Sequence, residues 1–185
     1  MNQKQTKKKT GAGFTLIEIL VVIGLIAILA TIVIIAINPA RQFAQGRDTQ
    51  RTSHLNTILN AIGQRMADNK GFFGDGTTLG IDGKSCPKIP SHETAAKITL
   101  PPKSGTVPAE AVQIGTASGN IDLSCLVPTY MSTMQFDPNG TADAANTGYY
   151  IVQDNNTTDG AGRVLLYSTS TEAPLNRTDY IYTER

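Results

Sequence analysis

The hydrophobic pattern separates an apolar N-terminal stretch from a more polar remainder. From Ile19 to Ile37 the chain has 19 consecutive residues without a charge, rich in Ile, Leu and Val. As a helix that rises ~1.5 Å per residue, this run would be roughly 28 Å long, close to the hydrocarbon thickness of a bilayer. We therefore predict a membrane-spanning helix at residues 14–38.

Beyond this run the pattern takes the period of an amphipathic helix. Pro39 has no amide hydrogen, so a helix that continues past it must kink or loosen there. An apolar stripe then follows with spacings of three and four, at Leu55, Ile58, Leu59, Ile62 and Met66. We predict the amphipathic half of the helix over residues 39–69, with Gly71 as its breaker.

The polar positions of the amphipathic half are expected to face solvent or another subunit. They are Arg41, Arg47, Asp48, Arg51, Gln64 and Arg65. A stripe of Arg41, Arg47 and Arg51 could also be interpreted as a site for DNA or lipid headgroups, but a solvated or subunit-facing helix surface is the commoner meaning of such a stripe.

Residues 70–185 predict a small β-rich head. Gly, Pro, Ser and Thr dominate residues 70–130, where only 97–100 and 112–114 look like short strands. Two β-rich runs, 148–153 and 163–168, flank a polar turn and predict a hairpin, and residues 180–182 are expected to add an edge strand. The predicted class is α+β, with a long N-terminal helix packed on a small antiparallel sheet.

The charge distribution sets the expected topology. Four lysines and no acidic residue stand in the first 13 positions, so their removal leaves 12 basic against 15 acidic residues. Lysines next to a membrane span stay in the cytoplasm, which places the head outside. The mildly acidic remainder argues against direct nucleic-acid binding, which needs clustered Lys and Arg.

Glu18 does not fit an ordinary span. A carboxylate at mid-membrane costs roughly 2.5–3.5 kcal/mol on insertion scales, and less near an interface. A secretory signal peptide has a shorter apolar region and a small-residue cleavage site after it, which Asn38-Pro39-Ala40-Arg41 does not provide. A signal anchor explains the length and the orientation but not Glu18, so we expect this carboxylate to be paired or functional.

The string Gly13-Phe14-Thr15-Leu16-Ile17-Glu18 resembles the class III signal of type IV prepilins and type II secretion pseudopilins. The resemblance implies that a prepilin peptidase cuts after Gly13 and that Phe14 is then N-methylated. It also implies that Glu18 of an incoming subunit pairs with the freed N-terminal amine of its neighbour. Residues 1–13 would be a cleaved leader peptide.

The resemblance implies a structural subunit of a pilus-like filament. The expected partners are further copies of the chain, the prepilin peptidase, assembly-platform proteins of the inner membrane, minor pilins and, before assembly, membrane lipid. A pseudopilin of a type II secretion system is the alternative, and a membrane-anchored binding module that does not polymerise is a third. The expected location is the cytoplasmic membrane and then an extracellular pilus or a periplasmic pseudopilus.

Catalytic motifs are missing from the sequence. No Ser/His/Asp set or Gly-rich phosphate loop is recognisable, and His54 and His92 have no nucleophile nearby in sequence, so we do not expect an enzyme.

Cys86 and Cys125, the two cysteines, are expected to form a disulfide in an exported chain, and two free buried thiols are the alternative. Closing a loop of about 40 residues would stabilise the head by roughly 3–4 kcal/mol.

Calcium is the one cofactor that the sequence suggests. Some major pseudopilins hold calcium in a C-terminal loop, and this chain offers hard oxygens at Asp137, Asp154, Asn156 and Asp159. The spacing fails the EF-hand template, and a turn rich in Asp, Asn and Thr explains the same residues. We therefore expect no cofactor, with calcium as the alternative.

Overall fold

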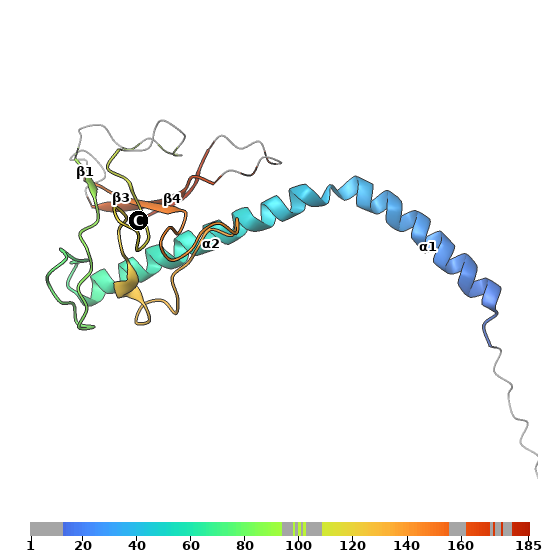
Figure 1. The fold of residues 1–185 in the computed structure, drawn as a ribbon, viewed down its shortest axis with the longest axis horizontal. Helices are drawn as coiled ribbons and strands as arrows, with labels where there is room; N and C mark the ends of the chain where they lie inside the picture. The colour runs from blue at the N-terminus through green and yellow to red at the C-terminus, as the bar shows by residue number, and fades with distance from the viewer. Residues whose placement is uncertain are drawn as a thin grey trace, which may run out of the picture. The chain divides into compact units, whose positions relative to one another are not determined.

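The computed structural model describes residues 13–93, 98, 100, 102, 109–155, 162–170, 172, 175 and 179–185. The chain divides into two compact units, Met1–Gln42 and Phe43–Arg185, each of which is described by itself. Figure 1 shows the elements in chain order, from the blue N-terminal helix to the red C-terminal strand.

Helix α1 (Leu16–Ile37) has no buried residue, and its side chains are almost all apolar. Its 22 residues are long and apolar enough to cross a membrane, by length and composition alone. The helix ends at Asn38, which takes the left-handed conformation with φ at 49°. Asn and Gly are the residues that adopt this conformation most readily, so Asn38 is a suitable helix terminator.

Helix α2 (Pro39–Asp68) begins at the proline that the sequence marked as an interruption. Pro suits the first position of a helix because that amide hydrogen has no partner within the helix. The helix ends where the sequence predicts, since Lys70 and Gly71 have φ values of 57° and 88°. Its apolar stripe is buried as expected at Leu55, Ile58, Leu59 and Ile62, while Met66 is partly buried against the same core.

One prediction for α2 is wrong. Asp48, Arg51 and Arg65 were expected on a surface that faces solvent or a subunit, but Asp48 is 7% exposed and the two arginines are 1% exposed. Each guanidinium is buried because carboxylates and carbonyls of the head surround it, and a buried charge is tolerated when it is paired and hydrogen-bonded. Arg41 and Gln64 are exposed as expected.

The sheet of the head has five strands. They are β1 (Ser91–His92), β2 (Val112–Gln113), β3 (Tyr149–Asp154), β4 (Arg163–Ser168) and β5 (Ile181–Glu184), with a short 3-10 helix at Ser124–Leu126. The order is β1-β3-β4-β5, and β2 also pairs with β3. β3 and β4 form the predicted hairpin, with Ile151 opposite Leu166, and β5 adds the predicted edge.

The α+β class is thus confirmed, with one difference in the sheet. β1 runs parallel to β3, so the sheet is mixed, whereas we expected an antiparallel sheet. β2 corresponds to the short strand expected at 112–114. Of the other short strand expected, at 97–100, residues 97 and 99 lie outside the described part of the chain, as does most of the polar turn after Asp154.

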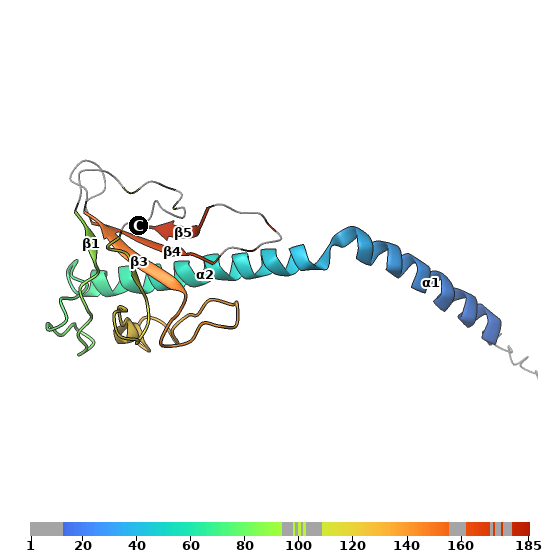
Figure 2. The same cartoon turned by 45° about the horizontal axis from the view of Figure 1, so that its top comes forward.

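The sheet lies along the C-terminal part of α2, which covers one of its faces (Figure 2). On that face Tyr149, Ile151 and Leu166 pack against the α2 stripe. Val152, Leu165 and Tyr167 alternate with them and form a second cluster on the other face. Tyr150, Tyr167 and Tyr180 stack there, with ring centroids 5.4 and 5.9 Å apart.

Candidate functional site

The N-terminal end of α1 carries the residues that the sequence singled out. Gly13 and Phe14 precede the helix and are exposed, Phe14 at 85%. An ideal Cβ placed on Gly13 would meet no atom of the described residues within 4 Å, so none of them crowds the Gly13 side of the Gly13–Phe14 peptide bond. This bond is therefore open to a protease that binds an extended segment.

Glu18 bonds to Thr15 in a capping box. Its Oε2 accepts from the Thr15 amide at 2.7 Å and from the Thr15 hydroxyl at 2.9 Å, while the Glu18 amide donates to Thr15 Oγ1 at 3.3 Å. Such reciprocal bonds satisfy amide hydrogens that have no partner at a helix start. The Glu18 carboxylate is thus bonded to Thr15, which directly follows Phe14. Phe14 is the expected new N-terminal residue.

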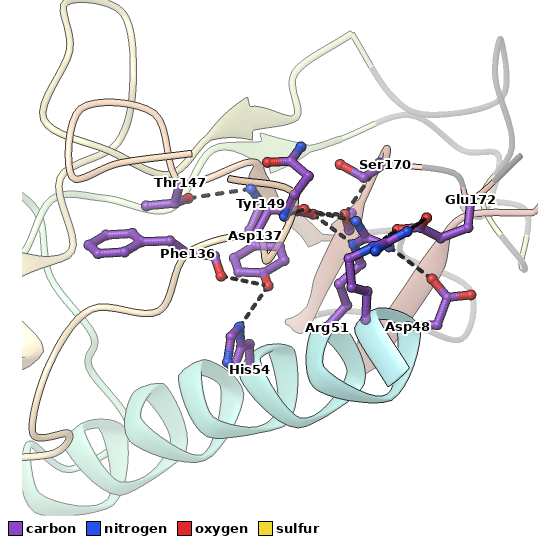
Figure 3. A network of polar contacts seen from close by, with 12 residues as sticks. Asp48, Arg51, His54, Phe136, Asp137, Thr147, Tyr149, Ser170 and Glu172 are labelled. Atoms are coloured by element: carbon purple, nitrogen blue, oxygen red, sulfur yellow. Dashed lines mark hydrogen bonds and ion pairs between the residues drawn. The ribbon is translucent and has the colours of Figure 1, made fainter. Parts of the chain in front are cut away.

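A second polar site joins the N-terminal part of α2 to the head, and Figure 3 shows its side chains. Arg51 on α2 donates from Nε to Oδ2 and from Nη2 to Oδ1 of Asp137, both at 2.9 Å. Its Nη1 donates to Asp48 at 2.9 Å and to Glu172 at 2.6 Å. Four charge-assisted hydrogen bonds thus hold one buried guanidinium.

Arg47, one turn earlier on α2, binds the same Glu172. Its Nε and Nη2 donate to Oε1 and Oε2 at 2.8 and 2.5 Å. These bonds, together with the charge of Arg51, lower the pKa of Glu172 to about 2. Burial alone would raise the pKa of Asp137, but its hydrogen bonds to Arg51 and the Arg51 charge outweigh burial and hold it below the ordinary value. The carboxylates therefore stay ionised at neutral pH.

Tyr149 on β3 extends this polar region along α2 (Figure 3). Its hydroxyl donates to the Phe136 carbonyl at 3.3 Å and lies 2.9 Å from His54 Nδ1. Burial raises the pKa of Tyr149, with a further contribution from the Asp137 charge. His54 is partly buried, and its Nδ1 contact with Tyr149 joins α2 to β3.

At the other end of α2 a disulfide and a buried arginine hold the loop that follows the helix. Cys86 and Cys125 form a disulfide with Cα atoms 5.5 Å apart, and no described cysteine is free. Arg65 donates to the carbonyls of Phe73 and Lys84 at 3.1 and 2.7 Å and pairs with Asp82. These contacts replace the solvated surface that we expected for Arg65.

Comparison with known families identifies the N-terminal segment. A family model described as the prokaryotic N-terminal methylation motif matches residues 8–34. The chain carries the class III signal of type IV pilins and pseudopilins. No curated protein and no solved structure matched the chain.

This signal supports a type IV pilin-like or pseudopilin precursor and indicates a structural subunit. The match covers the leader lysines Lys8 and Lys9, the predicted cleavage position and most of α1. The matched segment thus includes both the apolar helix and Glu18. Cleavage after Gly13, methylation of Phe14 and pairing of Glu18 stay predictions, as does the identity of the finished assembly.

Of the four calcium candidates the structure describes Asp137 and Asp154, and it does not bring these two together. Asp137 already accepts four hydrogen bonds, two from Arg51, one from the Ser168 hydroxyl at 3.0 Å and one from the Asn139 amide at 3.0 Å. Asp137 lies beside Gly148, just before β3, whereas Asp154 is the last residue of that strand, roughly 20 Å further along at ~3.3 Å per residue.

Asn156 and Asp159 lie outside the described residues. Within the described ones, no group of three or more His, Cys, Asp or Glu side chains is arranged for a metal. Calcium at the polar turn after Asp154 stays an untested prediction.

Sequence reasoning missed the ion-pair network at Arg51. Asp137 was noted only as a calcium candidate, and Glu172 was not noted at all. Arg51 is 86 residues from Asp137 and 121 from Glu172, so no local spacing links them. The available signal was the position of Arg51, four residues before Leu55 and therefore on the buried face of the helix.

Proposed function

We propose that this chain is the structural subunit of a type IV pilus-like surface filament. It would enter the membrane as a prepilin, lose residues 1–13 to a prepilin peptidase, be methylated on Phe14 and polymerise through α1. Its partners would be further copies of itself, the peptidase, platform proteins of the inner membrane and minor pilins. The head would lie outside the cytoplasm, and the filament outside the cell.

One observation carries this proposal, namely that no residue of α1 is buried in the part of the chain that the structure describes. All 22 residues are exposed, and the exposed side chains are Ile, Leu and Val over most of the helix. A soluble chain does not leave so much apolar surface in water. Lipid covers it in the precursor, and other copies of the same helix would cover it in a filament.

The position of Glu18 supports the hypothesis that leader removal prepares the chain for assembly. Cleavage would free an amine on Phe14, four residues before Glu18. In a low-dielectric helix bundle, opposite charges attract far more strongly than in water, although desolvation offsets part of that gain. Pairing of Glu18 with the amine of a neighbouring copy would therefore fix the register of subunits more than it would add stability.

Shearing of surface fibres from the native host tests this function. The chain should be a main component of long sheared filaments seen by electron microscopy, and deletion of its gene should remove them. Long filaments that lack the chain would overturn the pilus assignment. If short periplasmic assemblies contain the chain instead, it is the pseudopilin that we considered as the alternative.

A further inference from the structure

Asn139 and Gly140 form the one Asn-Gly pair of the sequence, and both are exposed in the turn that precedes β3. Gly140 has a φ of 82°, which favours glycine, and an ideal Cβ on it would meet no atom of the described residues within 4 Å. None of the hydrogen bonds found among those residues is donated by the Gly140 amide. This nitrogen is therefore open to react with the carboxamide next to it.

The Asn139 carboxamide is held by its own turn. Its Oδ1 accepts from the Thr141 amide at 3.0 Å and from the Thr141 hydroxyl at 2.9 Å. These bonds close an Asx turn, which folds the side chain back over the Asn139–Gly140 peptide bond. When a nucleophile adds to Cγ, negative charge develops on Oδ1, and two donors already placed on that oxygen stabilise it. The turn thus supplies both a nucleophile and a site for the oxyanion.

The chemistry that these groups support is deamidation. The Gly140 nitrogen bonds to Asn139 Cγ, and the side-chain NH2 leaves with the proton of that nitrogen as ammonia, so a cyclic succinimide remains. Solvent water then opens the ring. Cleavage at Cγ gives aspartate, and cleavage at the main-chain carbonyl gives isoaspartate, in which the chain runs through the former side chain. Either product carries a carboxylate that asparagine lacks.

The new carboxylate would lie beside the ion-pair network of α2. Asn139 lines a polar cavity of about 520 Å³ together with Arg47, Arg51 and Glu172. Its amide donates to Asp137 Oδ1 at 3.0 Å. The network already holds three carboxylates against two guanidiniums. A fourth carboxylate would repel these three and compete with Glu172 for Arg47, whose side chain is 37% exposed.

We propose that the Asn139–Gly140 pair is a site of spontaneous deamidation, and that the carboxylate formed there weakens the hold of Arg47 and Arg51 on Glu172. The reaction needs water alone as its co-reactant, so chains acquire the modification with age. It depends on this turn and not on the finished assembly, and it therefore goes beyond the proposed function.

The first test follows the modification in the full-length, detergent-solubilised chain at mildly alkaline pH. Peptide maps taken over time should show Asn139 converted to aspartate and isoaspartate, each with the mass increase that replacement of NH2 by OH gives. Asn146 is the internal comparison, because it is also exposed but precedes the β-branched Thr147, and it should stay intact while Asn139 converts. Conversion of Asn139 no faster than that of Asn146 would overturn the site.

The second test asks whether the bonds from Thr141 promote the reaction. Thr141→Val removes the hydroxyl donor and keeps the amide donor, so conversion of Asn139 should slow about fivefold, the effect of one hydrogen bond. Thr133→Val removes the hydroxyl of another exposed threonine and should leave the rate unchanged. An unchanged or faster conversion in Thr141→Val would show that the turn does not assist the reaction, and would contradict the proposal.

The third test measures the consequence for the head. Asn139→Asp carries the product charge from the start and should lower the denaturant midpoint, with a larger shift at low salt, because ions screen the added repulsion. Gln64→Glu makes the same amide-to-carboxylate change on the exposed side of α2 and should keep the wild-type midpoint. A wild-type midpoint for Asn139→Asp at low salt would overturn the predicted weakening. None of these outcomes depends on whether the chain forms filaments.

Discussion

Arg51 and Asp137 form a bidentate ion pair through two 2.9 Å hydrogen bonds, and both side chains are almost completely buried. The pair joins α2 to the loop that precedes β3. Together with Glu172 and Arg47 it fixes the base of the head to α2. The head is thus attached by charge at this end of the interface and by the apolar stripe further along α2.

Removal of Arg51 should destabilise the head strongly. Arg51→Ala leaves buried carboxylates without their cation, and loss of one partner of a buried pair typically costs about 3–5 kcal/mol. Denaturant unfolding of the detergent-solubilised chain, followed by near-UV circular dichroism, measures this. The exposed Arg41→Ala is the matched control and should change the free energy of unfolding by less than about 0.5 kcal/mol. A loss below about 1 kcal/mol for Arg51→Ala would show that the network does not hold the head.

Acid should weaken the same junction. The pKa of Glu172 is lowered from 4.5 to about 2 in the folded chain, so its contribution to stability is present above pH ~4.5 and is lost as the pH falls toward 2. The lowered pKa of Asp137 acts in the same direction. Glu172→Gln should lower the free energy of unfolding at pH 7 and flatten its decline between pH 4.5 and 2.

Unfolding free energies across that pH range test this prediction. The exposed Glu93→Gln serves as control and should reproduce the wild-type curve. A Glu172→Gln chain with the wild-type pH dependence would contradict the assignment.

The disulfide should contribute a large part of the stability of the head. Its two cysteines are separated by 39 residues, for which the chain-entropy model gives about 4 kcal/mol. Cys86→Ser with Cys125→Ser should lower the free energy of unfolding by an amount of that order, measured against the oxidised wild type. An equal stability of the two proteins would mean that the apolar core alone holds the long loop.

Gly13 should be required for leader removal. Gly13→Val places a branched side chain next to the predicted cleavage bond, so the precursor should keep its leader, which a gel shift or intact mass of the membrane fraction detects. Gly24→Val is the matched control within α1, because no atom of the described residues lies within 4 Å of a Cβ at Gly13 or Gly24. Normal processing of Gly13→Val would place the cleavage elsewhere.

Elements with a local signal could be predicted from the sequence. The uncharged run predicted α1, and the three-and-four spacing from Leu55 to Met66 predicted α2. The β-branched and aromatic runs predicted the β3–β4 hairpin. The class III signal was recognised because its residues are adjacent in sequence. These features depend on neighbours along the chain, which periodicity and composition report directly.

Features made by distant residues could not be predicted in this way. The polar character of Arg51 and Arg65 suggested a surface, but their partners come from loops far along the chain and permit burial. β1 has two residues and pairs in parallel with a strand about 60 residues later, so neither its length nor its neighbours mark it. Burial of charge and long-range pairing are decided by the tertiary structure.

The N-terminal residue of the chain within filaments tests the central claim most directly. Filaments sheared from the native host are digested, and the mass of the N-terminal peptide is measured. The account predicts a peptide that begins at Phe14 and carries one methyl group on its amine. A peptide that retains residues before Phe14, or one that begins at Phe14 without the methyl group, would contradict it.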